Sequence, residues 1–308
     1  MKKKIKWKKI MLILLTSLSV VIVAAGSYGW NLVTSTFTNI QEDIDRKKSD
    51  KRREAINFEE GDPFSLLLMG IDEPGSQGDV YRRTDTLILL TVNPKNNSTH
   101  MVSIPRDTYT KIAGENKKDK INHAYVFGGT EMTIRTVENF LDVPVDYFVR
   151  VDMEGLQDMI NALDGVKVKN NLEFTYRRSH FKKETIELSG EEAANYVRMR
   201  HKDPRGDLGR QERQRKVIQG MLNKAKSLSS IKRIEEILSV VEDNIRTNFS
   251  LEEAWNVQSN YKDALNKVKQ HEIPGEDGEI DEVYYYMPNE DKVEKLSSLL
   301  QEHLELQK

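Results

Sequence analysis

Short apolar runs separated by turn residues predict strands in the first half of the chain. Three such runs occupy residues 64–69, 86–92 and 100–104. Runs of this length between turn signals are typical of buried strands. Residues 93–99 are polar and include Asn-Pro, so they are expected to join the second and third strands as a hairpin.

Further along, apolar residues at helical spacing alternate with more strand-like runs. Helices are expected at residues 130–141, 153–163, 209–228, 231–244 and 251–262, and two more open at Ser189 and Asn289. Strands are expected at residues 145–151, 268–273 and 283–287. Asp152 is placed to cap the helix that follows it, and Ser189 with Glu192 matches a capping box. Because strands and helices interleave, we predict an α/β fold, a layered sheet with flanking helices.

The N-terminus joins a lysine cluster to a long uncharged stretch. Lysines precede it at positions 2, 3, 4, 6, 8 and 9, and residues 10–41 carry no charge. The apolar part, residues 10–33, is long enough for one membrane span of about 20 residues. The positive-inside rule then leaves the N-terminus cytoplasmic and places the rest of the chain outside the cell membrane. A signal peptide cleaved near Val23-Ala24-Ala25 is the alternative, and it exports the remainder as well.

This interpretation divides the chain into four parts. Residues 1–9 form a cytoplasmic tail, 10–33 a single transmembrane anchor, 34–60 an extracytoplasmic linker and 61–308 the folded domain. The linker is expected to be solvated, because residues 42–60 are rich in both signs of charge.

Composition excludes several classes of function. The formal net charge is only −2 although 31% of the residues are charged, so the strongly basic character suited to nucleic acid is absent. The chain has no cysteine, which excludes disulfides, thiolate zinc sites and cysteine nucleophiles. We therefore expect no nucleic-acid partner.

Charged residues gather where the first three predicted strands begin or end. Asp72 follows the first strand, Asp85 precedes the second, and Arg106 and Asp107 follow the third. If these strands are neighbours, the four side chains meet at one region of the sheet, where ligands of α/β proteins often bind. Carboxylates that hold a magnesium ion beside arginine donors suit a pyrophosphate. The simpler interpretation is that the aspartates cap turns and the arginines pair on the surface, and these short segments alone favour it.

The segment 196–216 favours the anion site over the simpler interpretation, because it carries six arginines around a turn. They are Arg198, Arg200, Arg205, Arg210, Arg213 and Arg215. The turn at 203–209 opens a helix, and a helix N-terminus beside arginines is a natural anion site. Arg210 and Gln214 lie four residues apart and share a helix face. Arg198 and Arg200 cannot share one, so contact of both with one ligand requires the helix to end between or near them.

At this point the motifs resemble those of the LytR-CpsA-Psr family. The resemblance covers the anchor and residues 63–227, and the region after Ser227 carries no transferable motif. The motifs are Leu67-Leu68-Met69-Gly70-Ile71-Asp72, Arg83-Thr84-Asp85-Thr86, Ser103-Ile104-Pro105-Arg106-Asp107, Lys120-Ile121-Asn122-His123-Ala124-Tyr125, Leu188-Ser189-Gly190-Glu191-Glu192-Ala193 and residues 196–214. Each motif alone is weak, whereas the ordered set is strong.

The resemblance implies an enzyme that transfers an anionic glycopolymer, on this pattern wall teichoic acid, from an undecaprenyl-pyrophosphate carrier to peptidoglycan. The acceptor is the C6 hydroxyl of N-acetylmuramic acid, and a phosphodiester results. The alternatives are a phosphatase or pyrophosphatase that hydrolyses the carrier, and a membrane-tethered transcriptional regulator. A lipid-linked substrate also predicts an apolar cavity between the sheet and the helices, open near Arg198 and Arg210.

The same resemblance assigns roles to individual residues. Asp72, Asp85 and Arg106 are implied to be catalytic, and Asp72 and Asp85 to hold Mg²⁺, with Mn²⁺ as the alternative. The implied pyrophosphate-binding residues are Arg83, Arg106, Lys120, Arg198, Arg200, Arg210 and Gln214. The general base stays open between the two aspartates.

Overall fold

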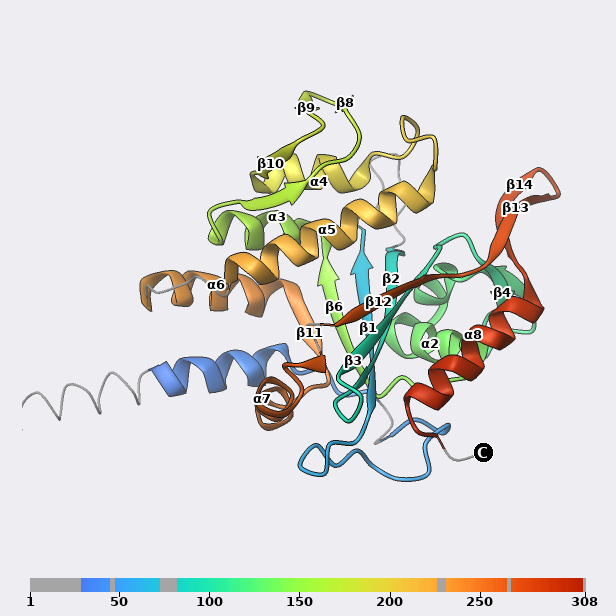
Figure 1. Ribbon diagram of the computed structural model, residues 1–308, viewed down its shortest axis with the longest axis horizontal. Coiled ribbons are helices and arrows are strands. Elements are labelled where there is room, and N and C mark those ends of the chain that lie inside the picture. Colours follow the sequence, from blue (N-terminus) through green and yellow to red (C-terminus); the bar gives the residue numbers. More distant parts are fainter. Residues whose placement is uncertain (1–28, 45–47, 73–81, 226–230, 265–266, 307–308) are drawn as a thin grey trace, which may run out of the picture.

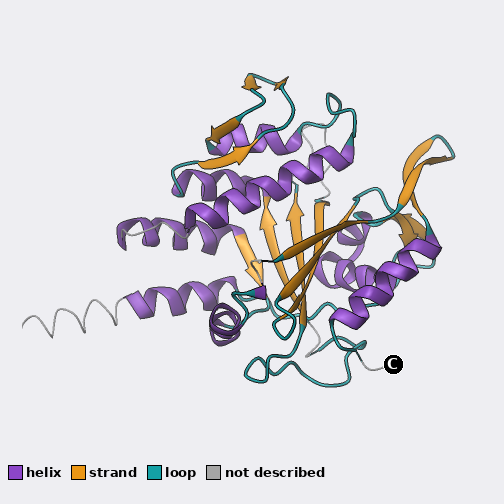
Figure 2. Ribbon diagram, in the orientation of Figure 1, coloured by secondary structure: helices purple, strands orange, loops and turns teal. Residues whose placement is uncertain are grey.

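A six-stranded mixed sheet runs through the centre of the molecule, with helices on both of its faces (Figure 1, Figure 2). The computed structural model describes residues 29–44, 48–72, 82–225, 231–264 and 267–306. The sheet has the order β11-β6-β1-β2-β3-β12. Its strands are β1 (Phe64–Ile71), β2 (Thr84–Asn93), β3 (Ser98–Ile104), β6 (Tyr147–Asp152), β11 (Ile245–Thr247) and β12 (Val268–Glu272).

Helices α2 to α8 flank this sheet, and four small two-stranded hairpins lie outside it (Figure 1). The helices are α2 (His123–Leu141), α3 (Met153–Ala162), α4 (Gly190–Arg198), α5 (Asp207–Ala225), α6 (Ile231–Asn244), α7 (Leu251–Asn260) and α8 (Glu290–His303). The hairpin strands are β4 (Tyr109–Lys111) with β5 (Lys118–Lys120), β7 (Val166–Lys169) with β10 (Thr185–Leu188), β8 (Phe174–Tyr176) with β9 (Ser179–Phe181), and β13 (Gly275–Ile280) with β14 (Val283–Pro288).

Successive side chains of the central strands point to opposite faces of the sheet, and an apolar layer lies on each face. On β1, Leu67, Met69 and Ile71 belong to the core beneath α2 and α8. The intervening Leu68 and Gly70 face a cavity on the side of α3, α4 and α5. This period of two is what the pleat of a strand imposes on its side chains. The predicted layered α/β architecture is therefore confirmed.

Several local predictions are also confirmed. β2 and β3 pair as an antiparallel hairpin, as expected for residues 93–99. The helix expected at residues 231–244 is α6, with the same bounds. Ser189 caps α4 with a complete capping box: its hydroxyl accepts the backbone N–H of Glu192, and its own N–H donates to the Glu192 carboxylate. Such caps are readable from sequence because both partners lie within four residues of each other.

Two local predictions need correction. The helix expected at residues 130–141 starts at His123, because Gly128 and Gly129 interrupt it with non-helical backbone and conceal the first part of its periodicity. Asp152 occupies the N-cap position of α3, but its side chain makes no capping bond. Its carboxylate instead pairs with Arg82 at 3.0 Å.

The predicted membrane anchor lies largely outside the described residues. Residues 1–28 fall outside them, and residues 29–33 belong to a helical segment that is described over residues 29–40. In the part of the chain that the structure describes, no helix combines the length and apolar character needed to cross a membrane. The cytoplasmic tail, the anchor and the linker boundaries stay predictions. The expectation that residues 42–60 are solvated is wrong in part, because Ser49 and Phe58 are buried and Arg52 pairs with Asp146 at 2.6 Å.

Three stacked histidines lie between the sheet and α8. The ring of His100 on β3 stacks on His303 with centroids 4.2 Å apart, and His271 on β12 lies 4.9 Å from His100. His303 is hydrogen-bonded through both ring nitrogens, to Thr91 and Ser98, at 2.9 Å each. Burial, then the neighbouring His303 and His271, lower the pKa of His100 from 6.5 to about 4. Burial also lowers the pKa of His271 and of His303.

We expect the free energy of unfolding to fall as the pH drops from about 6.5 to about 4. In this window the unfolded chain binds a proton at His100 and the folded chain does not, so acidification favours unfolding. His100 alone accounts for up to about 3 kcal/mol. Urea titrations at several pH values measure the effect. His100→Phe should flatten this part of the profile relative to wild type, and the exposed control His201→Phe should not; equal profiles would contradict the prediction.

Candidate functional site

The antiparallel strands β1, β2 and β3 bring the predicted site residues to one edge of the sheet. β1 runs antiparallel to β2, and β2 runs antiparallel to β3. The end of β1, the start of β2 and the end of β3 therefore lie side by side. Asp72, Asp85 and Arg106 stand at these three positions, so the strand neighbourhood that the sequence analysis assumed is present.

A β-bulge sets the direction of Asp85. Gly70 faces Thr86 and Ile71 faces Thr84, which leaves Asp85 as the extra residue of β2. Bulges re-aim side chains in this way and are common beside functional sites. Gly70 suits this close approach, because a Cβ at that position would lie only 3.0 Å from the Thr86 Cβ and would press on that side chain.

A chain of ion pairs links the acidic and basic residues at this edge. Both carboxylate oxygens of Asp85 accept hydrogen bonds from Arg106 Nη1, at 2.6 and 2.7 Å. Arg106 Nε lies 3.6 Å from Asp107, which also lies 3.1 Å from Lys120 Nζ and 4.0 Å from Arg200 Nη1. These contacts join residues from β2, the end of β3, β5 and the end of α4. The structure thus gathers Asp85, Arg106, Lys120 and Arg200 into one cluster.

Asp72 and Arg198 form a second pair at the same edge. Arg198 Nη2 lies 3.8 Å from the Asp72 carboxylate. The backbone N–H of Asp72 donates to the Arg83 carbonyl at 3.0 Å, so Arg83 stands directly across the ladder. These contacts place Asp72, Arg83 and Arg198 beside the bulge that presents Asp85.

Helix α4 ends where the sequence required it to end. Its last residue is Arg198, and Met199 has extended backbone with ψ 130°. Because the helix ends between them, the Arg198 and Arg200 side chains are not held on different helix faces. Each guanidinium lies within 4.0 Å of an aspartate carboxylate of the site. The prediction that the helix would end near Arg198 is confirmed.

The other arginines of this segment shape the turn between α4 and α5. Arg213 donates to Asp203 at 2.5 Å and to the Tyr196 carbonyl at 3.1 Å, and Arg205 binds Asp203 and Glu212. Burial by itself would raise the pKa of Asp203, but hydrogen bonds from Arg205 and Arg213 outweigh it and lower that pKa. Local pairing therefore explains Arg205 and Arg213, as the simpler interpretation expected.

Arg210 and Gln214 lie on the buried face of α5. Only 6% of Arg210 and 8% of Gln214 is exposed, and one helical turn separates them. Gln214 borders the same cavity as Gly70, Thr86 and Val197. It therefore lies close to the strand and helix positions that carry Asp72, Asp85 and Arg198.

An apolar cavity of about 300 Å³ lies between the sheet and the helices α3, α4 and α5. Leu68, Val149 and Val151 form its floor, and Leu156 and Ile218 lie among the residues that cover it. Val197, which borders it, directly precedes Arg198. The cavity predicted from the sequence is therefore present and adjoins the charged cluster.

Two features of this region were not fully predicted from the sequence. Asp107 was noticed as a strand-end residue, but its contacts with three cationic side chains were not foreseen. The hairpin β13–β14 was only half predicted, because β13 contains Gly-Glu-Asp-Gly-Glu and has no apolar period. Its Tyr284 ring lies under Arg200 and Lys120, with centroid distances of 5.9 Å to each cationic group. A cluster of tyrosines at 284–286 was the one available signal.

The chain matches known proteins over most of its length. The model of the LytR_cpsA_psr family matches residues 27–302. The chain is 48% identical over 304 residues to the polyisoprenyl-teichoic acid–peptidoglycan teichoic acid transferase TagU of Bacillus subtilis (strain 168), covering 97% of each chain.

Solved structures agree with this match. The crystal structure of B. subtilis TagU is 48% identical, with a TM-score of 0.63, and the match covers 80% of this chain and 98% of that one. A structure of TagT bound to LIIa-WTA is 34% identical, with a TM-score of 0.68, over 84% of this chain and 96% of that one. The chain therefore belongs to the LytR-CpsA-Psr family.

Proposed function

We propose that this protein is an enzyme that transfers teichoic acid from a polyisoprenyl-pyrophosphate carrier to peptidoglycan. The acceptor is the C6 hydroxyl of N-acetylmuramic acid, and the product is a phosphodiester. The enzyme is held at the cell membrane by residues 10–33, with its catalytic domain outside. Relatives whose names state this transfer, and which match this chain over nearly their whole length, support the proposal.

The observation that carries the proposal is the junction of two environments. An apolar cavity opens beside a cluster in which cationic side chains outnumber carboxylates. A polyprenyl pyrophosphate has the same two parts, an apolar chain and an anionic group. Burying each CH₂ of the chain contributes about 0.8 kcal/mol. A cavity of about 300 Å³ holds only the part of a long chain nearest the pyrophosphate, so the remainder would stay in the membrane.

The carboxylates of Asp72 and Asp85 fit a magnesium ion. Mg²⁺ prefers oxygen ligands and is commonly held by one or two carboxylates together with substrate phosphates. Asp85 already uses both oxygens toward Arg106, and Asp72 lies near Arg198, so each aspartate is oriented by an arginine. A bound ion would neutralise charge on the pyrophosphate and leave the arginines to orient it.

The reaction itself needs positioning and charge neutralisation more than covalent catalysis. The acceptor oxygen forms a bond to the phosphorus that carries the polymer, and the bond from that phosphorus to the lipid phosphate breaks. The electron pair leaves with the lipid phosphate, and a carboxylate of the cluster accepts the hydroxyl proton. Arg106, Arg198 and Arg200 are placed to bind the equatorial oxygens and the departing phosphate through paired N–H donors.

Reconstitution tests this function directly. The full chain in vesicles is supplied with a polyisoprenyl-pyrophosphate teichoic acid, Mg²⁺ and peptidoglycan, and polymer joined covalently to the peptidoglycan is measured. Release of free polymer without attachment would indicate hydrolysis and overturn the transferase. A donor whose lipid chain is too short to fill the apolar cavity should show a higher KM than a long-chain donor, because it buries less apolar surface there.

A further inference from the structure

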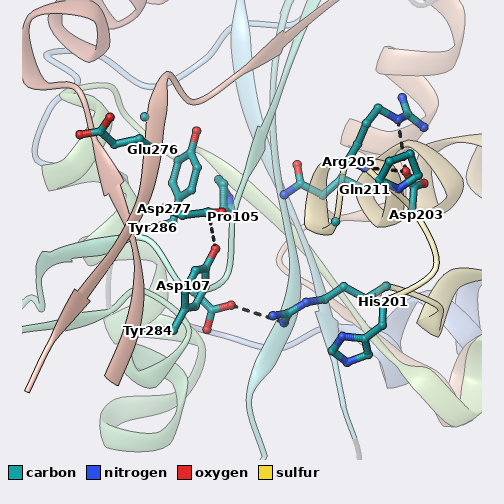
Figure 3. A pocket seen from close by; sticks show the side chains of 14 residues that line it. Pro105, Asp107, His201, Asp203, Arg205, Gln211, Glu276, Asp277, Tyr284 and Tyr286 are labelled. Carbon is teal, nitrogen blue, oxygen red and sulfur yellow. Dashed lines mark hydrogen bonds and ion pairs between the residues drawn. The ribbon is translucent and has the colours of Figure 1, made fainter. Parts of the chain in front are cut away.

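A second cavity, of about 540 Å³, adjoins the charged cluster on the side of β3 and β12. Figure 3 shows its two walls facing each other. On one side stand Glu276, Asp277, Tyr284 and Tyr286 of the hairpin β13–β14. On the other side Gln211 and the turn between α4 and α5 close it. Its volume is within the range of about 300–1,000 Å³ that ligand sites occupy.

The hairpin wall is fixed to the catalytic cluster. The backbone N–H of Tyr286 donates to the Asp107 carbonyl at 2.9 Å, and Tyr285 packs edge-on against Tyr109 at 4.9 Å. The Tyr284 hydroxyl donates to Asp277 at 2.7 Å (Figure 3), and burial followed by this bond raises the pKa of Tyr284. This wall is therefore built from tyrosine rings whose hydroxyls are already engaged and whose orientation is set.

The lining favours a neutral polar ligand over an anion. Four carboxylates border the cavity, those of Asp107, Asp203, Glu276 and Asp277, together with the two guanidinium groups of Arg200 and Arg205. Arg205 pairs with Asp203 and Arg200 lies 4.0 Å from Asp107, so the remaining charge of the lining is negative and would repel a phosphate or a polyanionic polymer. Carboxylate acceptors, the Gln211 amide and two tyrosine side chains suit the hydroxyl and acetamido groups and the apolar faces of sugar rings. A saccharide is the ligand class that uses all of these groups.

The position of the cavity matches the side from which the acceptor must come. The apolar cavity lies over β11, β6, β1 and β2, whereas this second cavity lies beyond the end of β3, next to β12. The charged cluster stands between the two. In phosphoryl transfer the attacking and leaving oxygens are roughly in line on opposite sides of the phosphorus. With the lipid phosphate leaving toward the apolar cavity, the attacking hydroxyl enters from the side of the second cavity.

We propose that the cavity between the hairpin β13–β14 and the α4–α5 turn binds the acceptor saccharide of the reaction. This inference rests on the proposed function and adds to it a subsite formed largely by residues 275–286. Arg200 and Asp107 border both this cavity and the charged cluster, so they mark the point where acceptor and pyrophosphate meet.

The test varies donor and acceptor concentrations separately with purified full-length protein. The variant is Glu276→Ala/Asp277→Ala, whose sites are exposed on the hairpin, and the control is Glu279→Ala, on the same strand but away from the cavity. The acceptor is a soluble glycan-strand fragment of peptidoglycan. The double variant should raise the acceptor KM about tenfold, the effect of losing one or two hydrogen bonds, and leave the donor KM within roughly twofold. The control should match wild type in both.

Other results of this experiment would contradict the proposal or the function on which it rests. A rise in the donor KM alone would assign the cavity to the sugars of the donor and overturn the proposal. Unchanged KM values for both substrates would overturn it as well, because the cavity would then take no part in binding. A wild-type protein that binds donor but attaches no polymer would overturn the proposed function, and the acceptor site with it.

Discussion

Replacing Asp85 with alanine is expected to lower kcat/KM for transfer by about a thousandfold or more, with the fold retained. The variant removes one of the two carboxylates proposed to hold Mg²⁺ and also releases Arg106, whose Nη1 binds both oxygens of Asp85. Loss of a metal ligand and of one oriented cation both act on the charge that develops in the transition state. Transfer assays over a range of Mg²⁺ concentrations, with circular dichroism as the check of folding, measure the effect.

The exposed carboxylate Asp158 on α3 provides the matched control, since Asp158→Ala removes the same group from a helix surface. Activity of that variant should stay near wild type. If Asp85→Ala kept its Mg²⁺-dependent transfer, the metal would have to bind elsewhere and the assignment of Asp72 and Asp85 would be wrong.

Arg198→Lys is expected to lower kcat/KM by about a hundredfold although the charge is kept. Lysine is a point charge without the planar pair of N–H donors that matches two phosphate oxygens. Arg198 ends α4 and lies 3.8 Å from Asp72, one of the two carboxylates proposed to hold Mg²⁺, and the proposed function has it bind the pyrophosphate as well. Removing one such donor from a preorganised site typically costs a factor of about 10² to 10³.

The exposed Arg178 serves as the control, because Arg178→Lys makes the same substitution away from the cluster. Donor binding, measured by titration with a non-transferable polyprenyl pyrophosphate, should weaken for Arg198→Lys and not for Arg178→Lys. Wild-type kinetics in Arg198→Lys would show that the guanidinium serves only to pair with Asp72.

Much of the scaffold followed from local pattern. The apolar runs of β1, β2 and β3, the capping box at Ser189 and the end of α4 all depend on residues within a few positions of one another. Elements without such a pattern were missed or displaced. The start of α2 was hidden by Gly128 and Gly129, and β13 by its glycines and acids.

The candidate site was likewise predictable from the sequence only in part. The ordered motifs identified Asp72, Asp85, Arg106, Arg198 and Arg200 as a set, because residue type and spacing persist along a chain. The same motifs left Arg205 and Arg213 outside the implied pyrophosphate-binding set but did not say what these two residues contact. Their pairing with Asp203 depends on how the turn closes, which only the packing of α4 against α5 decides.

The sequence by itself therefore determined five of the six strands of the central sheet, the approximate positions of the helices and the identity of the groups that carry charge. The physical reason is that propensity, periodicity and capping are local, and local interactions can be inferred from residue spacing. The tertiary structure alone decided the bulge that turns Asp85 and the convergence of three cationic side chains on Asp107. It also decided that residues 275–286 stand beside a cluster built mainly from residues 72–200. Such contacts join positions far apart in the chain, and they form only when the layers pack and fix every neighbour at once.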